Sequence, residues 1–447
     1  MSSLRFRLTQ GVAAAIVVLG FSACGGWRES SATSSPPLPA ATTLPTDVET
    51  TEAAIRFLED RVRRDPDDFI AYNKLAGYYF QRQRETGGLN YLELASRAAR
   101  ASLAAIPAEQ NKNGLAALAQ AEYASHDFAA ARDHAVQLSR LDPGKSYPYL
   151  ILTDALIELG DYKAAAIAIA KMERLGGSDG NSEPRLARYA LLRGETDLAM
   201  RRFALGLTHA LSVEPPSREA VAWCRWQLGE TAFSFGDYET AQRHYLDALV
   251  TFPGYYRALA SLGRVLAARG DVPGAIEQYE RAIAVIPDPA FVAALGDLYK
   301  LSGREKEAAA KYELVEQIAR LSATNGVMYN RQLALFYADH DMKAGEAYAS
   351  AAREYTVRRD IYGADAVAWT AFKAGKLAEA QSAIKEALRL GTRDSKLFYH
   401  AGMISRAAGD FASARSYLER VLKLNPQFDP MQALNARQAL EMTDSER

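Results

Sequence analysis

A recurring interval of about 34 residues between turn-forming glycines is the feature that most restricts how this chain folds. Several successive intervals are 33 or 34 residues long, and His126 and His340 stand where two further units would carry the glycine. A fixed period of this length indicates stacked helical hairpins, because one hairpin cannot bury its own apolar face. The glycines expected to end the first helix of a hairpin are Gly160, Gly194, Gly236, Gly270, Gly303, Gly375 and Gly409.

The residues inside each unit support this interpretation. The small residues Gly229 and Ala241 are expected where the two helices of a hairpin cross, because they let the backbones approach closely. The larger Leu228 and Tyr245 are expected to fill the space beside the crossing. Pro253 is expected to end the second helix.

These residues at these positions resemble the tetratricopeptide-repeat family, from about residue 51 to the end of the chain. The resemblance implies an all-α fold, an α-solenoid of stacked helix-turn-helix hairpins that forms a right-handed superhelix. It predicts N-terminal units over 51–210, a connecting loop over 211–220, C-terminal units over 221–430, and a capping helix and tail over 431–447.

The N-terminus has the pattern of a secretory signal peptide. Arg5 and Arg7 precede an uncharged apolar run of 11 residues from Gly11 to Phe21, which is too short to span a bilayer as a helix. Ordinary signal peptidase wants small residues at −1 and −3, and Phe21 at −3 disfavours it. The segment is similar to a lipobox with Cys24 as the lipidated residue. The remaining alternative is an incidental cysteine in an uncleaved anchor.

The lipoprotein interpretation predicts three segments: a signal peptide over 1–23, a lipidated Cys24, and a disordered Ser/Thr/Pro-rich tether over 24–50. Two or three acyl chains give stable membrane anchoring. The expected location is the cell envelope. In an organism with two membranes, a residue other than aspartate after the lipidated cysteine, here Gly25, resembles the rule that sorts lipoproteins to the outer membrane. The protein would then face the periplasm.

Composition gives little sign of chemistry. The 53 basic and 54 acidic residues leave a net charge of −1, so no nucleic-acid partner is expected. The six histidines and two cysteines form no metal-ligand spacing and no catalytic pair. We therefore expect no metal, no cofactor and no catalytic residue. Cys224 is expected to be a buried structural thiol, with a reactive thiol as the alternative.

Ligands of tetratricopeptide-repeat proteins usually bind the concave face, through the first helix of each hairpin. Two aromatic clusters are expected there, Trp223 with Trp226 and Phe233, and Tyr362 with Trp369 and Phe372, unless they pack against neighbouring units. The family positions give these candidate groove residues: Gln120, Tyr123, Tyr147, Asp154, Arg188, Trp223, Trp226, Glu230, Arg264, Asp297, Arg331, Tyr362, Asp365, Trp369 and Arg406.

The function favoured by these observations is a non-enzymatic scaffold or adaptor, anchored by lipid at the bacterial cell envelope, that binds a peptide or protein partner in its groove. Charges of mixed sign along the groove suit such a partner better than a polyanion. The alternative is a lipoprotein that binds a small ligand or a glycan, since aromatic patches in a curved groove also suit sugar rings. An enzyme is the third interpretation, and no catalytic pair supports it.

Overall fold

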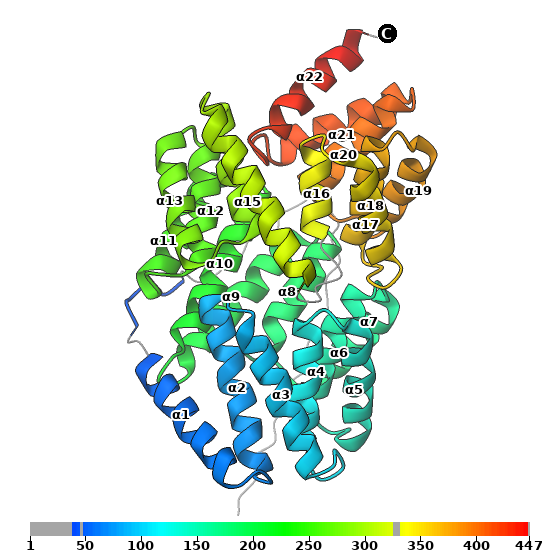
Figure 1. Cartoon of the computed structure of the whole chain (residues 1–447). Coiled ribbons are helices and arrows are strands. Elements are labelled where there is room, and N and C mark those ends of the chain that lie inside the picture. The colour runs from blue at the N-terminus through cyan, green and yellow to red at the C-terminus, as the bar shows by residue number, and fades with distance from the viewer. Residues whose placement is uncertain (1–37, 45–47, 325–330, 446–447) are drawn as a thin grey trace, which may run out of the picture. The chain divides into compact units, whose positions relative to one another are not determined.

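The computed structural model describes residues 38–44, 48–324 and 331–445, which form 22 α-helices and no strand (Figure 1). The signal peptide and Cys24 lie outside the described residues. The predicted all-α solenoid is confirmed.

The first eleven helices are α1 (Val48–Arg64), α2 (Phe69–Thr86), α3 (Asn90–Ala105), α4 (Lys112–Ala124), α5 (Phe128–Leu141), α6 (Tyr147–Glu158), α7 (Tyr162–Gly176), α8 (Ser182–Leu192), α9 (Thr196–Ser212), α10 (Arg218–Ser234) and α11 (Tyr238–Thr251). The next eleven are α12 (Tyr256–Ala268), α13 (Val272–Val285), α14 (Pro289–Leu301), α15 (Glu305–Thr324), α16 (Arg331–Asp339), α17 (Ala344–Tyr355), α18 (Ile361–Lys373), α19 (Leu377–Ala387), α20 (Ser395–Ala407), α21 (Phe411–Leu424) and α22 (Gln432–Ser445).

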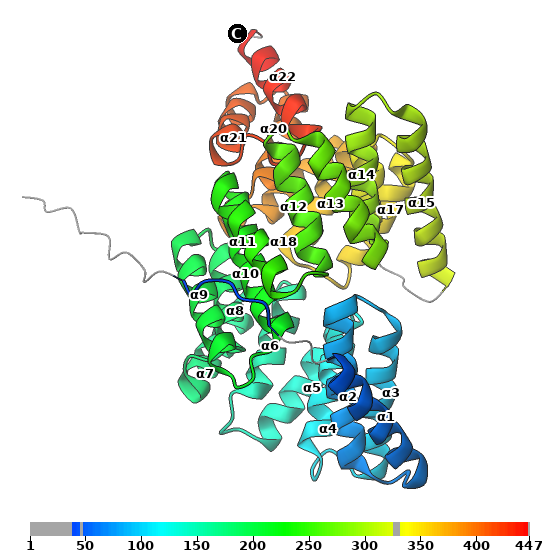
Figure 2. The same cartoon turned by 90° about the vertical axis from the view of Figure 1, so that its left-hand side faces the viewer.

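From α2 onwards, an even-numbered helix and the odd-numbered helix that follows it form a hairpin, and successive hairpins lie side by side (Figure 2). The helices cross where small residues were expected. A Cβ atom added at Gly229 would lie 2.4 Å from Cε1 of Tyr245, and one at Gly263 would lie 2.8 Å from Cδ2 of Tyr279. Glycine is therefore what allows a tyrosine of the second helix to pack against the backbone of the first.

The turn inside a hairpin follows from two adjacent residues. All seven turn glycines have a positive φ, as a left-handed helix end requires. Asp237 then caps the next helix, its carboxylate accepting from the backbone N–H of Thr240 at 3.1 Å. His126 takes the left-handed conformation in place of glycine, as predicted. The prediction for His340 was wrong by one residue: the left-handed residue is Asp341, because the helix continues through His340, whose backbone N–H still donates to the carbonyl oxygen of Phe336 at 3.2 Å.

Two predicted boundaries differ slightly from the helices. Helix α9 runs to Ser212 and α10 begins at Arg218, so the link between them is 213–217, inside the expected 211–220. The C-terminal helix α22 occupies Gln432–Ser445 of the expected 431–447.

The tether expected over 24–50 ends earlier than the composition suggested. The segment over residues 38–44 runs across α9 and α10 (Figure 2). Leu38 and Leu44 pack against the core between these helices, and Arg225 donates to the carbonyl oxygen of Pro39 at 3.1 Å. The reason is that two leucines add apolar surface, and a guanidinium that is only 1% exposed needs acceptors. Helix α1 then begins at Val48.

Hairpins far apart in the sequence also touch. The turn glycines Gly160, Gly194 and Gly236 lie against the links that precede α18, α20 and α22. Hydrogen bonds join these turns to the links, between residues that are 187 to 200 positions apart in the sequence. We call the contact of these three turns with residues 358–361, 391–393 and 424–427 the seam.

The seam combines neutral hydrogen bonds with a buried ionic network. The hydroxyl oxygen of Tyr162 accepts from the backbone N–H of Ile361 at 2.9 Å. Glu158, whose side chain is 6% exposed, pairs with both Arg188 and Arg358. Burial opposes the charge of Glu158, but the two guanidinium groups outweigh it and hold its pKa below the ordinary value. The seam therefore depends on a carboxylate that stays ionised.

Candidate functional site

Two adjoining cavities form a groove in the C-terminal half of the chain. The larger has a volume of about 450 Å³ and the smaller about 230 Å³. They share the wall residues Ala290, Ala294, Lys396 and Asp429. We call this continuous space the groove.

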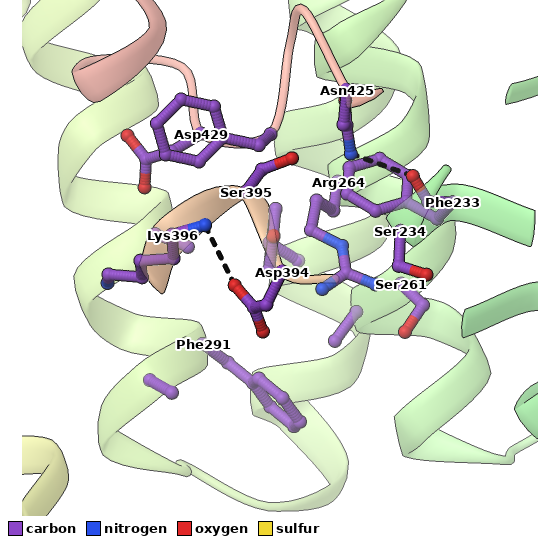
Figure 3. A pocket seen from close by; sticks show the side chains of 15 residues that line it. Phe233, Ser234, Ser261, Arg264, Phe291, Asp394, Ser395, Lys396, Asn425 and Asp429 are labelled. Carbon is purple, nitrogen blue, oxygen red and sulfur yellow. Dashed lines mark hydrogen bonds between the residues drawn. The ribbon is translucent and has the colours of Figure 1, made fainter. Parts of the chain in front are cut away.

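One wall of the groove is built from the first helices of four consecutive hairpins, α10, α12, α14 and α16. The opposite wall is the start of α20 and the link from α21 into α22 (Figure 3). Asn425 fastens this link at the seam, because its side-chain amide donates to the carbonyl oxygen of Phe233 at 2.7 Å. The seam thus sets the width of the groove.

A hydrogen-bonded chain supports the wall at α10 and α12. The indole N–H of Trp226 donates to Ser261 Oγ at 2.9 Å, and that hydroxyl donates to Glu230 at 2.7 Å. Arg264 donates to the same carboxylate oxygen at 2.6 Å and lies over the ring of Phe233. Burial opposes the charge of Glu230, but Arg264 and the neighbouring hydroxyls hold its pKa below the ordinary value. Arg264 is thereby fixed at the groove surface.

The adjoining cavity contains two further ion pairs. Lys396 reaches Asp339 at 2.9 Å. His340 Nε2 lies 2.7 Å from Asp297 Oδ1. Burial disfavours the charged imidazole, but the hydrogen bond and charge of Asp297 outweigh burial and raise the pKa of His340. Lys396 and His340 are therefore each matched by a carboxylate in this part of the groove.

The structure brings some of the predicted residues to the groove and uses others elsewhere. Arg264 and Asp297 line the cavities. Trp226 and Glu230 lie behind the wall in the chain just described, and Trp223 stands 6.5 Å from Trp226, ring centre to ring centre. None of these last three residues lines either cavity.

Three predicted groove residues belong to the seam network or its surroundings. Arg188 donates to the hydroxyl oxygen of Tyr123 at 3.3 Å and pairs with Glu158. Arg331 pairs with Asp360 at 2.7 Å and with Glu354 at 3.3 Å. These side chains join hairpins to one another, so their part in ligand binding stays a prediction.

The remaining polar predictions are dispersed. Asp154 pairs with Arg185 at 2.7 Å, the Tyr147 hydroxyl donates to Asp142 at 2.9 Å, and Asp365 faces His400 Nδ1 at 2.8 Å. Arg406 is half-buried on α20. The exposed predicted residues away from the groove are Gln120 and Tyr362.

Trp369 is packed rather than exposed, which differs from the expectation for the second aromatic cluster. It is 1% exposed, stacks on His400 at a centroid distance of 4.2 Å, and donates from its indole N–H to Asp339 at 2.7 Å. The next hairpin supplies the histidine and a buried aspartate supplies the acceptor, so the ring fits the core. Trp369 is therefore not a surface for a partner in this structure.

Sequence reasoning missed the wall opposite the first helices. Asp394, Ser395 and Lys396 begin α20, and Phe428 and Asp429 precede α22. Asp394, Phe428 and Asp429 lie in links between hairpins, and Ser395 and Lys396 form the first turn of α20. The family pattern does not assign these positions to ligands. The sequence does show an aspartate before each of these two helices, Asp394 and Asp429. An aspartate at that position by itself predicts a helix cap and not a ligand site.

Cys224 is buried, as predicted, and burial raises the pKa of its thiol to about 12. Within the described part of the chain, no group of three or more metal-ligating side chains comes together, and no helix is both long and apolar enough to cross a membrane.

Comparison with known proteins identifies the repeat. The sequence model described as "Tetratricopeptide repeat" matches residues 227–290 and 366–428. The chain thus contains tetratricopeptide repeats. Both matched segments contribute to the groove walls. Proteins with these repeats generally mediate protein–protein interactions as non-enzymatic scaffolds. No curated protein matches this sequence.

Several solved structures are similar to this chain at low identity. PilW, a type IV pilus biogenesis factor, is 15% identical, with 48% of this chain and 93% of PilW covered at a TM-score of 0.40. PilF of Pseudomonas aeruginosa is 13% identical, with coverages of 71% and 99% and a TM-score of 0.31. The human IFIT1 dimer with PPP-AAAA is 12% identical, with coverages of 84% and 87% and a TM-score of 0.45.

Proposed function

We propose that this protein is a non-enzymatic adaptor that is anchored by lipid at the bacterial cell envelope and captures a segment of a partner protein in the groove. The observation that carries the proposal is the groove itself. It is lined by the first helices of four hairpins, the surface through which such repeats generally contact partners, and its volume of about 450 Å³ suits side chains of a bound segment.

The geometry favours a protein segment over a glycan. The tryptophans that suggested sugar binding, Trp223 and Trp226, line neither cavity, and the Trp226 indole already donates to Ser261. The groove instead alternates aromatic rings with charged groups held in fixed positions, a combination suited to side chains of an extended segment.

Photocrosslinking tests the partner. A photoreactive benzoylphenylalanine replaces Phe291, which lines the groove and is half-buried, and is irradiated in native membranes. The matched control carries the same group at Ile167, which is 68% exposed on α7. We expect one or a few proteins, identified by mass spectrometry, to be crosslinked at position 291 and not at 167. Identical products at both positions, or none at 291, would contradict partner capture in the groove.

Membrane anchoring rests on the N-terminal pattern and has its own test. Cys24→Ala removes the acceptor of the lipid, so we expect the variant to leave the membrane fraction while wild type stays. Mass spectrometry of the wild-type N-terminal peptide should find a diacylglyceryl group on Cys24. An unmodified cysteine would contradict the lipoprotein interpretation and leave the groove proposal standing.

A further inference from the structure

The cations at the groove are already neutralised by carboxylates of the protein. Arg264 lies 2.6 Å from Glu230, and Lys396 lies 2.9 Å from Asp339. An anionic ligand would have to compete with these carboxylates for the same donors. The groove therefore has no free positive charge to offer.

Two carboxylates on the opposite wall have no such partner. Asp394 Oδ1 accepts from the backbone N–H groups of Lys396 and Leu397, at 2.8 and 3.1 Å, and so caps α20. Asp429 Oδ1 caps α22 in the same way, at 2.9 and 2.8 Å. Neither aspartate forms an ion pair with any described residue. Burial raises the pKa of both carboxyl groups, and it outweighs the opposing charge of Lys396 near Asp429 and of His400 near Asp394.

Buried polar atoms without partners lie beside these carboxylates. Ser395 is 6% exposed and lines the larger cavity, and its Oγ has no hydrogen-bond partner among the described residues (Figure 3). Gln432 is 4% exposed and lines the smaller cavity, and its Oε1 likewise has none. Unpaired acceptors are costly when buried, so both atoms indicate that a ligand with hydrogen-bond donors belongs here.

Apolar surface borders the same acceptors. Phe291 and Phe428 are half-buried and line the larger cavity. A ligand that satisfies the whole set has a long apolar stem and ends in a cationic group with several N–H donors. Among protein side chains only lysine and arginine have this form.

We propose that the groove recognises a lysine or arginine side chain of the partner segment, with the cationic group bound by Asp394, Asp429 and Ser395 and the aliphatic stem against Phe291. This inference rests on the proposed capture of a protein segment and specifies its chemistry. Aromatic rings beside the carboxylates add a cation–π attraction to the charge attraction.

Fluorescence anisotropy tests the inference with a defined probe on the full-length protein. The probe is a short fluorescein-labelled peptide of alternating alanine and lysine. Its controls are the same peptide with every lysine acetylated, and a peptide with glutamate in place of lysine. We expect the lysine peptide to bind wild type at least about tenfold more tightly than either control. Equal binding of the lysine and acetyl-lysine peptides would overturn the inference without the need for any variant.

The double variant Asp394→Asn/Asp429→Asn assigns the binding to the two carboxylates. Asparagine keeps the caps of α20 and α22, so the fold should survive. The matched control is Asp271→Asn/Asp410→Asn, which changes two exposed caps outside the groove. We expect the groove variant to lose about tenfold or more in affinity for the lysine peptide, and the control variant to bind as wild type does. Unchanged binding by the groove variant would overturn the inference.

The two proposals fail in distinguishable ways. If wild type crosslinks a partner from position 291 and the Asp394→Asn/Asp429→Asn protein crosslinks it equally well, the adaptor function stands and cationic recognition is wrong. If the lysine peptide binds at the two aspartates but no partner is crosslinked at 291, the adaptor function is wrong and the cationic site stands.

Discussion

The turns at Gly160, Gly194 and Gly236 occupy the same place in the repeat as those at Gly270, Gly303, Gly375 and Gly409, yet they have different surroundings. Both groups have φ between +72° and +87°. A Cβ atom added at Gly160 would lie 2.1 Å from the carbonyl oxygen of Arg359, and one at Gly194 would lie 2.8 Å from that of Gly391. At Gly270, Gly303, Gly375 and Gly409 an added Cβ would meet nothing within 4 Å.

Glycine therefore has a different role in each of the two groups of turns. At the open turns glycine serves only the left-handed backbone that ends a helix. At the seam it also leaves room for the backbone of a link about 200 residues away in sequence. The seam turns therefore connect distant hairpins, and through Asn425 they fix the far wall of the groove.

The largest expected effect comes from the ionic centre of the seam. Glu158→Gln keeps the shape of the side chain but leaves the guanidinium groups of Arg188 and Arg358 without their buried counter-charge. We expect a loss of about 4 kcal/mol of unfolding free energy, measured by urea denaturation. The control Glu307→Gln, beside the open turn at Gly303, breaks an exposed ion pair and should leave the urea midpoint close to wild type. Equal midpoints for the two variants would contradict a stabilising seam network.

Alanine at the two kinds of turn tests the comparison itself. Gly409→Ala strains only the left-handed backbone and should cost about 1 kcal/mol. Gly160→Ala adds a collision with Arg359 and should cost about 3 kcal/mol in total. The shift of the urea midpoint measures both. If the two substitutions cost the same, the two groups of turns are not distinct.

A smaller effect is expected from one seam hydroxyl. Tyr162→Phe leaves the buried N–H of Ile361 without its acceptor and should cost about 2 kcal/mol. Tyr417→Phe is the control, because its hydroxyl has no hydrogen bond to a described residue and its ring is half-buried. Hydrogen exchange should show faster exchange at Ile361 in the first variant only. An unchanged exchange rate there would argue against the bond.

The smallest effect concerns pH. Because the folded-state pKa of Glu158 lies below its ordinary value of 4.5, its ionisation contributes stability that is present above pH 4.5 and is lost as the pH falls through the folded-state value. Urea midpoints measured between neutral and acidic pH should therefore fall more steeply for wild type than for Glu158→Gln. Parallel pH profiles would mean that Glu158 titrates alike in both states.

Much of the local structure could be predicted from the sequence. The spacing of Gly236 and Gly270 predicts the hairpin turns, and Gly229 with Tyr245 predicts the helix crossings, because each depends on neighbours within one unit. The same reasoning correctly predicts that Cys224 is buried.

The seam and the far wall of the groove could not be predicted in this way. They depend on the small rotation between successive hairpins, accumulated over about 200 residues, which no local pattern records. Sequence reasoning therefore could not show that Arg188 pairs with Glu158 beside the seam, and it assigned no role to Asp394 and Asp429, which line the groove.

The most direct test is whether residues 424–427 contact the turn at Gly236 in solution, as the seam requires. Benzoylphenylalanine replaces Tyr238, whose hydroxyl lies 2.6 Å from Asn425 Oδ1, and the crosslinked peptides are identified by mass spectrometry in dilute protein. The control places the same group at Val272, the equivalent position after the open turn at Gly270. The account predicts intramolecular crosslinks from position 238 to residues 425–427 and none to these residues from 272. Crosslinks from 238 only to neighbouring hairpins would contradict the seam and the groove that it closes.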